Sequence, residues 1–126
     1  MICRGGGYMP TNIETGKYGE DLVADLLTKA GWTIIIRNWR CSDGELDLVA
    51  HDGSAVVAVE VKTRRGTNFG TPIEAVTKAK AARLRRLLMR WIHESDVHAR
   101  VVRVDVVGVL IGPTGQPVIQ HIRNAC

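Results

Sequence analysis

The sequence predicts an α/β domain with a mixed central β-sheet flanked by helices. Segments with the periodicity of amphipathic helices and β-branched strand segments follow one another in the order α-β-β-β-α-β, and a short strand ends the chain. A length of 126 residues suits one domain. Apolar residues make up 45% and charged residues 24% of the chain, so its composition is that of a globular domain rather than a disordered segment.

The first residues differ from the rest of the chain. Residues 1–12 are rich in glycine and have no periodic apolar face, so we expect 1–13 to be a flexible tail and 14–126 to form the domain. No apolar run approaches the roughly 20 residues that span a bilayer, and the start lacks the apolar core of a secretory signal. We therefore expect a cytoplasmic protein that binds no membrane. The three cysteines lie outside any CxxC pattern and are expected to be reduced thiols.

A first amphipathic helix is predicted from about Thr15 to Ala30. Apolar side chains recur there at helical spacing, and Gly31 follows where a left-handed C-terminal cap is favoured. A buried strand is predicted next, from Trp32 to Trp39, because this segment contains the β-branched run Thr33–Ile36. The strand leads into a polar turn.

A β-hairpin is predicted from the alternating segments Glu45–His51 and Ala55–Lys62 around Asp52-Gly53. A tight turn at this dipeptide pairs residue 51 with 54 and puts Asp47 diagonally across from Glu60. A loop longer by two residues puts Asp47 directly opposite Glu60. In both registers Asp47, Glu60 and Lys62 lie on one face of the hairpin, because side chains alternate with period two.

A long second helix is expected to begin at Thr71, because Thr71-Pro72-Ile73-Glu74 has the pattern of a capping box with proline at the first helical position. Its apolar stripe consists of Ile73, Val76, Leu84, Leu87, Leu88 and Trp91. Lys80 falls in the middle of this stripe. Either its ammonium extends past the stripe to water, or the stripe packs beside the charged face of the hairpin and Lys80 reaches a phosphate or an acid. Strands at 101–111 and about 118–122 complete the domain.

Charge indicates a class of partner. The formal charge of +4 and the pI of about 9.3 suit a polyanion such as nucleic acid, although many basic proteins bind none. On the second helix, the outward residues Arg83, Arg85, Arg86 and Arg90 have the pattern of a solvated face.

The hairpin carries the strongest candidate site. Two carboxylates a few ångströms apart repel each other, and hard oxygen ligands of this kind suit Mg²⁺ or Mn²⁺. A metal held by Asp47 and Glu60 would activate water for phosphodiester hydrolysis, and Lys62 would stabilise the developing charge. The alternative is a solvated face of a two-stranded ribbon with simple ion pairs between the strands. Spacing alone slightly favours the solvated face.

A family resemblance favours the site. The ordered motifs are Gly16-x-x-Gly19-Glu20, Asn38-Trp39-Arg40, Gly44-Glu45-Leu46-Asp47-Leu48-Val49, Val59-Glu60-Val61-Lys62-Thr63-Arg64, Arg103-Val104-Asp105-Val106-Val107 and Asn124-Ala125. Together they cover residues 14–126 and resemble the YraN family, which is similar to archaeal Holliday-junction resolvases and belongs to the PD-(D/E)XK nuclease superfamily.

The resemblance implies a restriction-endonuclease-like core and a set of roles. Asp47 and Glu60 would be the acids that hold Mg²⁺ or Mn²⁺, Lys62 the motif lysine, and Glu20 a further acid near the metal. It implies an enzyme that hydrolyses DNA phosphodiester bonds, with branched or structured DNA as a candidate substrate, and a twofold homodimer by analogy with resolvases. The alternatives are a non-catalytic nucleic-acid-binding module and an accessory protein that acts through a protein partner.

Other residues receive weaker assignments. Arg64 and Arg65 follow the site directly, so we expect them to contact phosphates, and Arg40 and Lys80 are assigned to nucleic-acid binding as well. Asp105 lies in an apolar strand, where a structural pair with an arginine is expected. The four histidines have no ligand spacing and receive no role.

Overall fold

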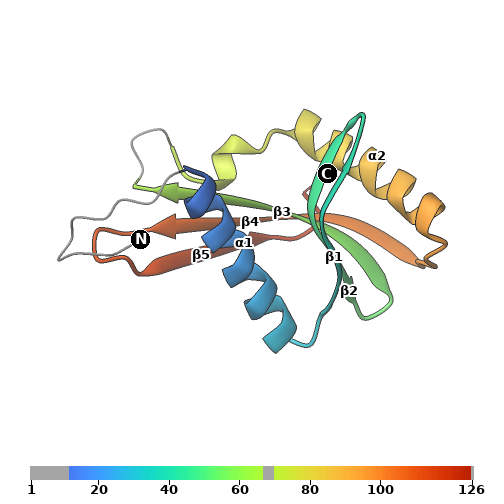
Figure 1. Ribbon diagram of the computed structural model, residues 1–126, viewed down its shortest axis with the longest axis horizontal. Coiled ribbons are helices and arrows are strands. Elements are labelled where there is room, and N and C mark those ends of the chain that lie inside the picture. The colour runs from blue at the N-terminus through green and yellow to red at the C-terminus, as the bar shows by residue number, and fades with distance from the viewer. Residues whose placement is uncertain (1–11, 67–69, 126) are drawn as a thin grey trace.

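The computed structural model describes residues 12–66 and 70–125, and within them two helices pack on a five-stranded mixed sheet (Figure 1). In chain order the elements are α1 (Asn12–Lys29), β1 (Thr33–Cys41), β2 (Gly44–Asp52), β3 (Ala55–Arg65), the 3₁₀ helix η1 (Ile73–Ala75), α2 (Lys78–Ser95), β4 (Val101–Ile111) and β5 (Pro117–Ile122). The predicted order of helices and strands and the mixed sheet are confirmed. The expected tail lies outside the described residues up to residue 11, and α1 begins at Asn12.

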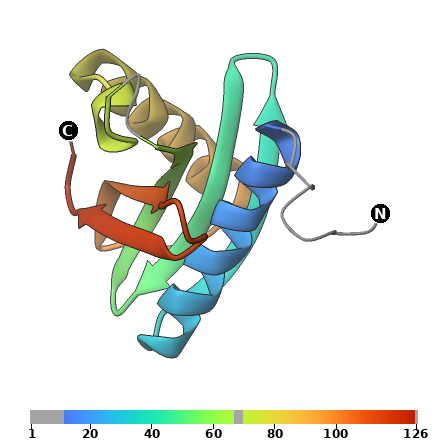
Figure 2. The same ribbon diagram turned by 90° about the vertical axis from the view of Figure 1, so that its left-hand side faces the viewer.

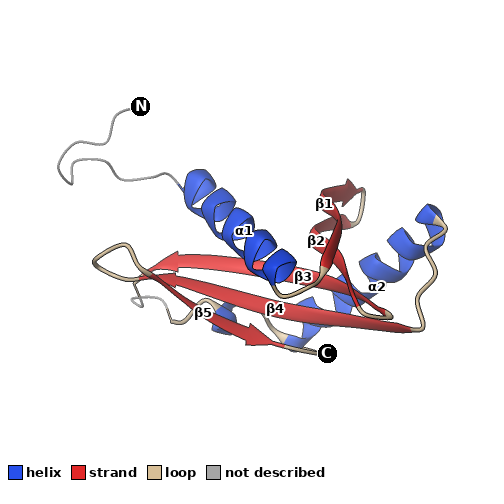
Figure 3. Ribbon diagram, turned by 90° about the horizontal axis from the view of Figure 1, so that it is seen from below, coloured by secondary structure: helices blue, strands red, loops and turns tan. Residues whose placement is uncertain are grey.

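The strands lie in the order in which they occur in the chain, from β1 to β5. All neighbours are antiparallel except β3 and β4, which are parallel over their whole length and are connected through α2. A parallel pair needs such a crossover connection. Figure 3 shows β3 and β4 as the long central strands beneath α1. Neither described helix is long and apolar enough to cross a membrane.

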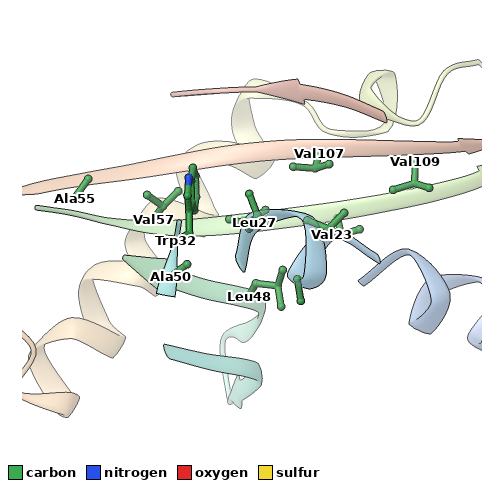
Figure 4. Packing of buried hydrophobic residues seen from close by; sticks show 12 residues of the cluster. Val23, Leu27, Trp32, Leu48, Ala50, Ala55, Val57, Val107 and Val109 are labelled. Atoms are coloured by element: carbon green, nitrogen blue, oxygen red, sulfur yellow. The ribbon is translucent and has the colours of Figure 1, made fainter. Parts of the chain in front are cut away.

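The two helices cover opposite faces of the sheet (Figure 2). On the α1 face, Val23 and Leu27 pack against alternate residues of the central strands, as Figure 4 shows. The helix ends as predicted: Gly31 has a φ of +97°, and the Trp32 N–H donates to the Leu27 carbonyl at 3.0 Å. Helix α1 therefore lies where its apolar stripe meets one side of β2 and β3.

On the other face, α2 covers β2 and β3. The buried residues of this cluster are Leu46, Val49, Val56, Ala58, Leu84, Leu87, Leu88, Trp91 and Val104. This side of the hairpin is the one that carries Asp47, Glu60 and Lys62. The solvated-ribbon alternative is therefore wrong for Glu60, whose exposed fraction is only 6%.

The hairpin turns one residue later than our first register assumes. Asp52 pairs with Ala55 and Leu48 with Val59, so the turn residues are Gly53 and Ser54. Gly53 is the first of them and has a φ of +61°, which glycine adopts without strain. This register, extended by one residue, puts Asp47 opposite Glu60. A direct pair of Asp47 and Glu60 is the second of the two registers considered from the sequence. It arises here because the turn is shifted by one residue and not because the loop is longer.

The second helix begins later than expected. The Thr71–Glu74 pattern forms only the short turn η1, in which the Thr71 N–H donates to the Glu74 carboxylate at 3.4 Å. Thr77 is the N-cap of α2 and accepts from the Lys80 N–H at 3.1 Å. The cause is tertiary packing, because a side chain at Gly108 of β4 would lie 2.9 Å from Ile73. The bare backbone at this position lets η1 pack closely on the sheet.

Candidate functional site

A cavity of about 280 Å³ lies between the β2–β3 hairpin and α2. Its lining residues are Gly44, Glu45, Asp47, Glu60, Val61, Lys62, Lys80, Arg83, Leu84 and Leu87. The predicted constellation of Asp47, Glu60 and Lys62 is thus brought together in one hollow, and α2 adds two cations to it. We call this hollow the acidic cavity.

Asp47 is held where β2 separates from β3. The ladder between the two strands ends at Leu48 and Val59, and beyond it the Val61 N–H donates to Asp47 Oδ2 at 2.9 Å. The carboxylate therefore takes the place of a backbone acceptor. Leu46 packs with the α2 cluster while Leu48 packs with the α1 cluster, so strict alternation of side chains is lost at this point.

The environment of Asp47 favours its protonated form. Burial, followed by the negative charges of Glu60 and Glu20, raises the pKa of this carboxyl to about 7, although the hydrogen bond from the Val61 N–H opposes the rise. A carboxyl of this kind is half-protonated near neutral pH. A cation placed beside it would favour the ionised form and lower its pKa.

Glu60 is a buried carboxylate compensated by lysines. It lies in β3, between β2 and β4, and its side chain is 7% exposed. Lys80 Nζ lies 2.9 Å and Lys62 Nζ 3.9 Å from the same oxygen, Glu60 Oε2. Lys80 therefore reaches an acid beneath α2, which is the second of the two placements considered for it. A buried charge without such a partner would be costly.

The two lysines are perturbed in opposite directions. The pKa of Lys62 is lowered, first by burial and then by the positive charge of Lys80. The pKa of Lys80 is raised: burial would lower it, but the hydrogen bond and the charge of Glu60 outweigh burial. Lys80 is thus the fixed counter-ion of Glu60. Lys62, held less tightly at 3.9 Å, is the lysine that remains available for another anion.

Glu20 lies close to the acidic cavity but does not line it. It is half-buried on α1, and its charge contributes to the raised pKa of Asp47. Burial also raises the pKa of Glu20, against the opposing effect of Arg37. The geometry places this acid on the periphery of the site.

The three arginines assigned to nucleic-acid binding do not line the cavity either. Arg40 Nε lies 3.0 Å from Glu45 Oε2. Arg64 and Arg65 end β3, two and three residues beyond Lys62. The Arg64 Nε atom is buried and has no hydrogen-bond partner among the described residues, whereas Arg65 is exposed. Their contact with phosphates stays a prediction.

Sequence reasoning missed Arg83 as a cavity residue. Its guanidinium donates to the Asp43 carbonyl at 2.7 Å, which ties the β1–β2 turn to α2. The sequence spacing indicates this position: Lys80, Arg83 and Leu87 recur at helical spacing, so a helix face that directs Lys80 toward the hairpin also directs Arg83 there.

A second charged cluster lies between β4 and β5, away from the acidic cavity. Asp105 is fully buried, and Arg103 donates to it at 2.9 Å, which confirms the expected pair with an arginine. His121 also contacts Asp105, at 2.8 Å, so the view of this histidine as incidental is wrong. Despite burial, these contacts and the Asn124 N–H lower the pKa of Asp105 to about 2. The cluster fastens the C-terminal strand to the sheet.

Comparison with known proteins identifies the family. Residues 19–109 match the family model described as "Uncharacterised protein family UPF0102". A UPF0102 protein of Rhodococcus opacus is 52% identical over 93% of this chain and 99% of its own length. A relative from Beutenbergia cavernae is 55% identical over 86% of this chain and 92% of its own length. UPF0102 protein SCO5602 of Streptomyces coelicolor is 50% identical over 98% of each chain. The chain therefore belongs to the UPF0102 family, which is the YraN family that its motifs resemble.

Proposed function

We propose that this protein is a metal-dependent nuclease that hydrolyses DNA phosphodiester bonds. The observation that carries the proposal is the acidic cavity, where Asp47 and Glu60 lie beside Lys62 in a hollow that is open to a ligand. The order of elements and the positions of these three residues agree with the PD-(D/E)XK pattern, and a restriction-endonuclease-like core is part of the proposal.

The donor set fits a hard divalent cation. In residues 12–66 and 70–125 no three acidic, histidine or cysteine side chains are arranged around one point, so a metal would take two carboxylates from the chain and complete its shell with water. Mg²⁺ binds in this way, through one or two carboxylates and retained waters. Asp47 and Glu60 would hold it. When bound, the ion would polarise a phosphoryl oxygen and lower the pKa of a coordinated water.

The other residues of the cavity have separable tasks. Lys62 is free enough to donate hydrogen bonds to a phosphoryl oxygen and to stabilise the charge that develops there. The backbone of β3 fixes Asp47 through the Val61 N–H, so this carboxylate is positioned before any ligand arrives. Lys80 places a positive charge 2.9 Å from Glu60 without a metal.

The ion pair between Lys80 and Glu60 also favours a second candidate function, a nucleic-acid-binding module without catalysis. With Lys80 at 2.9 Å, Glu60 already has a cation, and a phosphate could bind Lys62 and Arg83 without a metal. The two candidates differ in one respect: only the nuclease needs the carboxylate of Asp47 for its activity.

The test is cleavage of labelled linear, flapped and four-way DNA in Mg²⁺ or Mn²⁺. We expect the wild type to cut at least one substrate and Asp47→Ala and Glu60→Ala to cut none, with all three proteins folded by circular dichroism. Equal cutting by wild type and Asp47→Ala, after repurification, would reject the site. Metal-free binding without any cutting would favour the non-catalytic module.

A further inference from the structure

A basic ridge leads from the acidic cavity onto the outer surface of α2. Lys80, Arg83 and Arg86 follow one another at intervals of three residues, which places them along one oblique row of the helix. Lys80 and Arg83 line the acidic cavity. A second cavity, of about 380 Å³, is lined by Asp43, Arg83, Arg86 and Leu87. Because Arg83 and Leu87 line both hollows, the two cavities adjoin, and together they form what we call the α2 groove.

The positive charge of this groove is not neutralised at its centre. Lys80 is paired with Glu60, and Arg90, one turn beyond Arg86, is paired with Asp43 and Glu94. Arg83 donates to a carbonyl oxygen, which carries no formal charge. Within the part of the chain that the structure describes, neither Arg83 nor Arg86 has an ion pair with an acid. Two guanidinium charges therefore lie next to the acidic cavity without a counter-ion among the described residues.

One wall of the α2 groove is fixed by the turn between β1 and β2. Arg83 holds the Asp43 carbonyl at 2.7 Å, and Arg90 holds the Asp43 carboxylate at 2.8 Å. Gly44 has a φ of +148°, and a side chain there would lie 3.1 Å from Leu87 and 3.3 Å from Arg83. The turn is thus packed against α2 before any ligand binds, and a preorganised wall lowers the cost of ordering on binding.

We infer that the α2 groove binds the phosphodiester backbone of the nucleic-acid strand whose scissile bond lies in the acidic cavity, with Arg83 and Arg86 on neighbouring phosphates. This inference rests on the proposed function and adds the path of the substrate to it. Three residues of α-helix rise by roughly 4.5 Å, which is comparable to the ~3.4 Å axial spacing of phosphates along one strand of a duplex. Guanidinium groups are suited to phosphates because their planar fork offers paired donors.

Arg86 is the cleanest position for a test, and Arg85 is its matched control. Arg86 is exposed and makes no hydrogen bond or ion pair with the other residues that the structure describes, so its removal should leave the fold unchanged. Arg85 is exposed on the same helix but donates to the Val102 carbonyl of β4 at 3.4 Å and lines neither cavity. Both substitutions to alanine remove one positive charge. A difference between them therefore reports position rather than net charge.

The experiment measures the affinity of a fluorescein-labelled DNA duplex by anisotropy across a salt series, in EDTA so that no metal is present. The logarithm of affinity falls with the logarithm of salt with a slope of about −0.9 per neutralised phosphate. We expect Arg86→Ala to make the slope shallower by about 0.9 and Arg85→Ala to leave it unchanged. Equal slopes for the two variants, or a wild type that does not bind the duplex at low salt, would overturn the inference. Poly-glutamate bound as tightly as DNA, with the same dependence on Arg86, would also overturn it.

Cleavage in Mg²⁺ by the same proteins separates this inference from the proposed function. If the wild type cuts DNA but Arg86→Ala keeps the wild-type salt slope, the inferred binding of nucleic acid in the α2 groove is refuted and the nuclease proposal stands. If the slope changes as expected but no protein cuts, the groove stands and the nuclease fails. If the wild type cuts DNA, and DNA binding weakens in Arg86→Ala but not in Arg85→Ala, the nuclease and the α2 groove are both supported.

Discussion

Replacing Lys80 with methionine tests whether this lysine is the resident counter-ion of Glu60. The substitution keeps most of the aliphatic part of the Lys80 side chain and removes the ammonium group. The Glu60 side chain, which is 7% exposed in the wild type, then has Lys62 at 3.9 Å as its nearest described cation. We expect the metal-free protein to lose stability because a buried carboxylate has lost its closest partner.

The magnitude follows from the geometry. Removing one partner of a fully buried ion pair costs roughly 3–5 kcal/mol, and an exposed pair is worth about 0.2–1 kcal/mol. Lys80 is 38% exposed and Lys62 remains nearby, so the cost lies between these limits. We expect about 2 kcal/mol in urea unfolding at neutral pH with EDTA.

Three controls make the result specific. Lys78→Met, at the exposed start of the same helix, should change stability by less than about 0.5 kcal/mol. Adding Glu60→Gln to Lys80→Met should restore most of the loss, because the stranded charge is gone. Mg²⁺ should stabilise Lys80→Met more than the wild type, since a cation can then replace the missing ammonium. A loss no larger than that of Lys78→Met would refute the assignment of Lys80, as would a loss that persists beside Glu60→Gln.

Three further predictions address other parts of the site. Because the pKa of Asp47 is raised from 3.8 to about 7, chiefly by burial, the folded state binds this proton more tightly than the unfolded state does. The free energy of unfolding of the metal-free protein should therefore fall as the pH rises from about 4 to about 7. Asp47→Asn should flatten this pH dependence when unfolding is measured across the same range. Lys62→Met should slow single-turnover DNA cleavage by roughly 10² to 10³ without weakening Mn²⁺ binding; an unchanged rate would leave Lys62 without a catalytic task. Gly19→Ala should cost about 1–3 kcal/mol, because the new methyl group would overlap the Thr63 side chain, whereas Gly16→Ala, which meets no atom within 4 Å, should be neutral or stabilising; equal effects of the two changes on thermal unfolding would contradict the packing of α1 on β3.

The sequence carried enough information for the element order and for the face on which the acids lie. Strand periodicity places Asp47, Glu60 and Lys62 together in any register with a loop of even length, so an error of one residue in the turn did no harm. The position of the turn depends on where Gly53 lies in it. Glycine can adopt positive φ either as the second turn residue, after Asp52, or as the first, before Ser54, so local chemistry allows both turns. In the structure Gly53 is the first turn residue.

The start of α2 and the partners of its charged residues depended on contacts between distant segments. Thr71 and Glu74 have the local signals of a helix start, but the packing of η1 on Gly108 ends that turn, and Thr77 caps α2 instead. Spacing placed Lys80 in the apolar stripe without showing what lay opposite it. That required the position of α2 against β3, which no local pattern contains.

His121 shows the same limit across strands. It pairs with Val107 in the β4–β5 ladder, which brings it within reach of Asp105, two residues earlier on β4. The sequence separation of 16 residues gives no indication of this contact, because the register between β4 and β5 depends on the turn that joins them.

The central claim is that Asp47 and Glu60 form the cation site of this protein and that Lys62 does not take part in holding the ion. Calorimetric titration of Mn²⁺ into wild type, Asp47→Asn and Lys62→Met at neutral pH tests it most directly. We predict saturable binding to the wild type, the same or tighter binding to Lys62→Met, and an affinity at least about tenfold weaker for Asp47→Asn, a loss of the size expected when one charged ligand is removed. A wild type that binds no Mn²⁺, or an Asp47→Asn variant that binds it as tightly as the wild type, would contradict the claim.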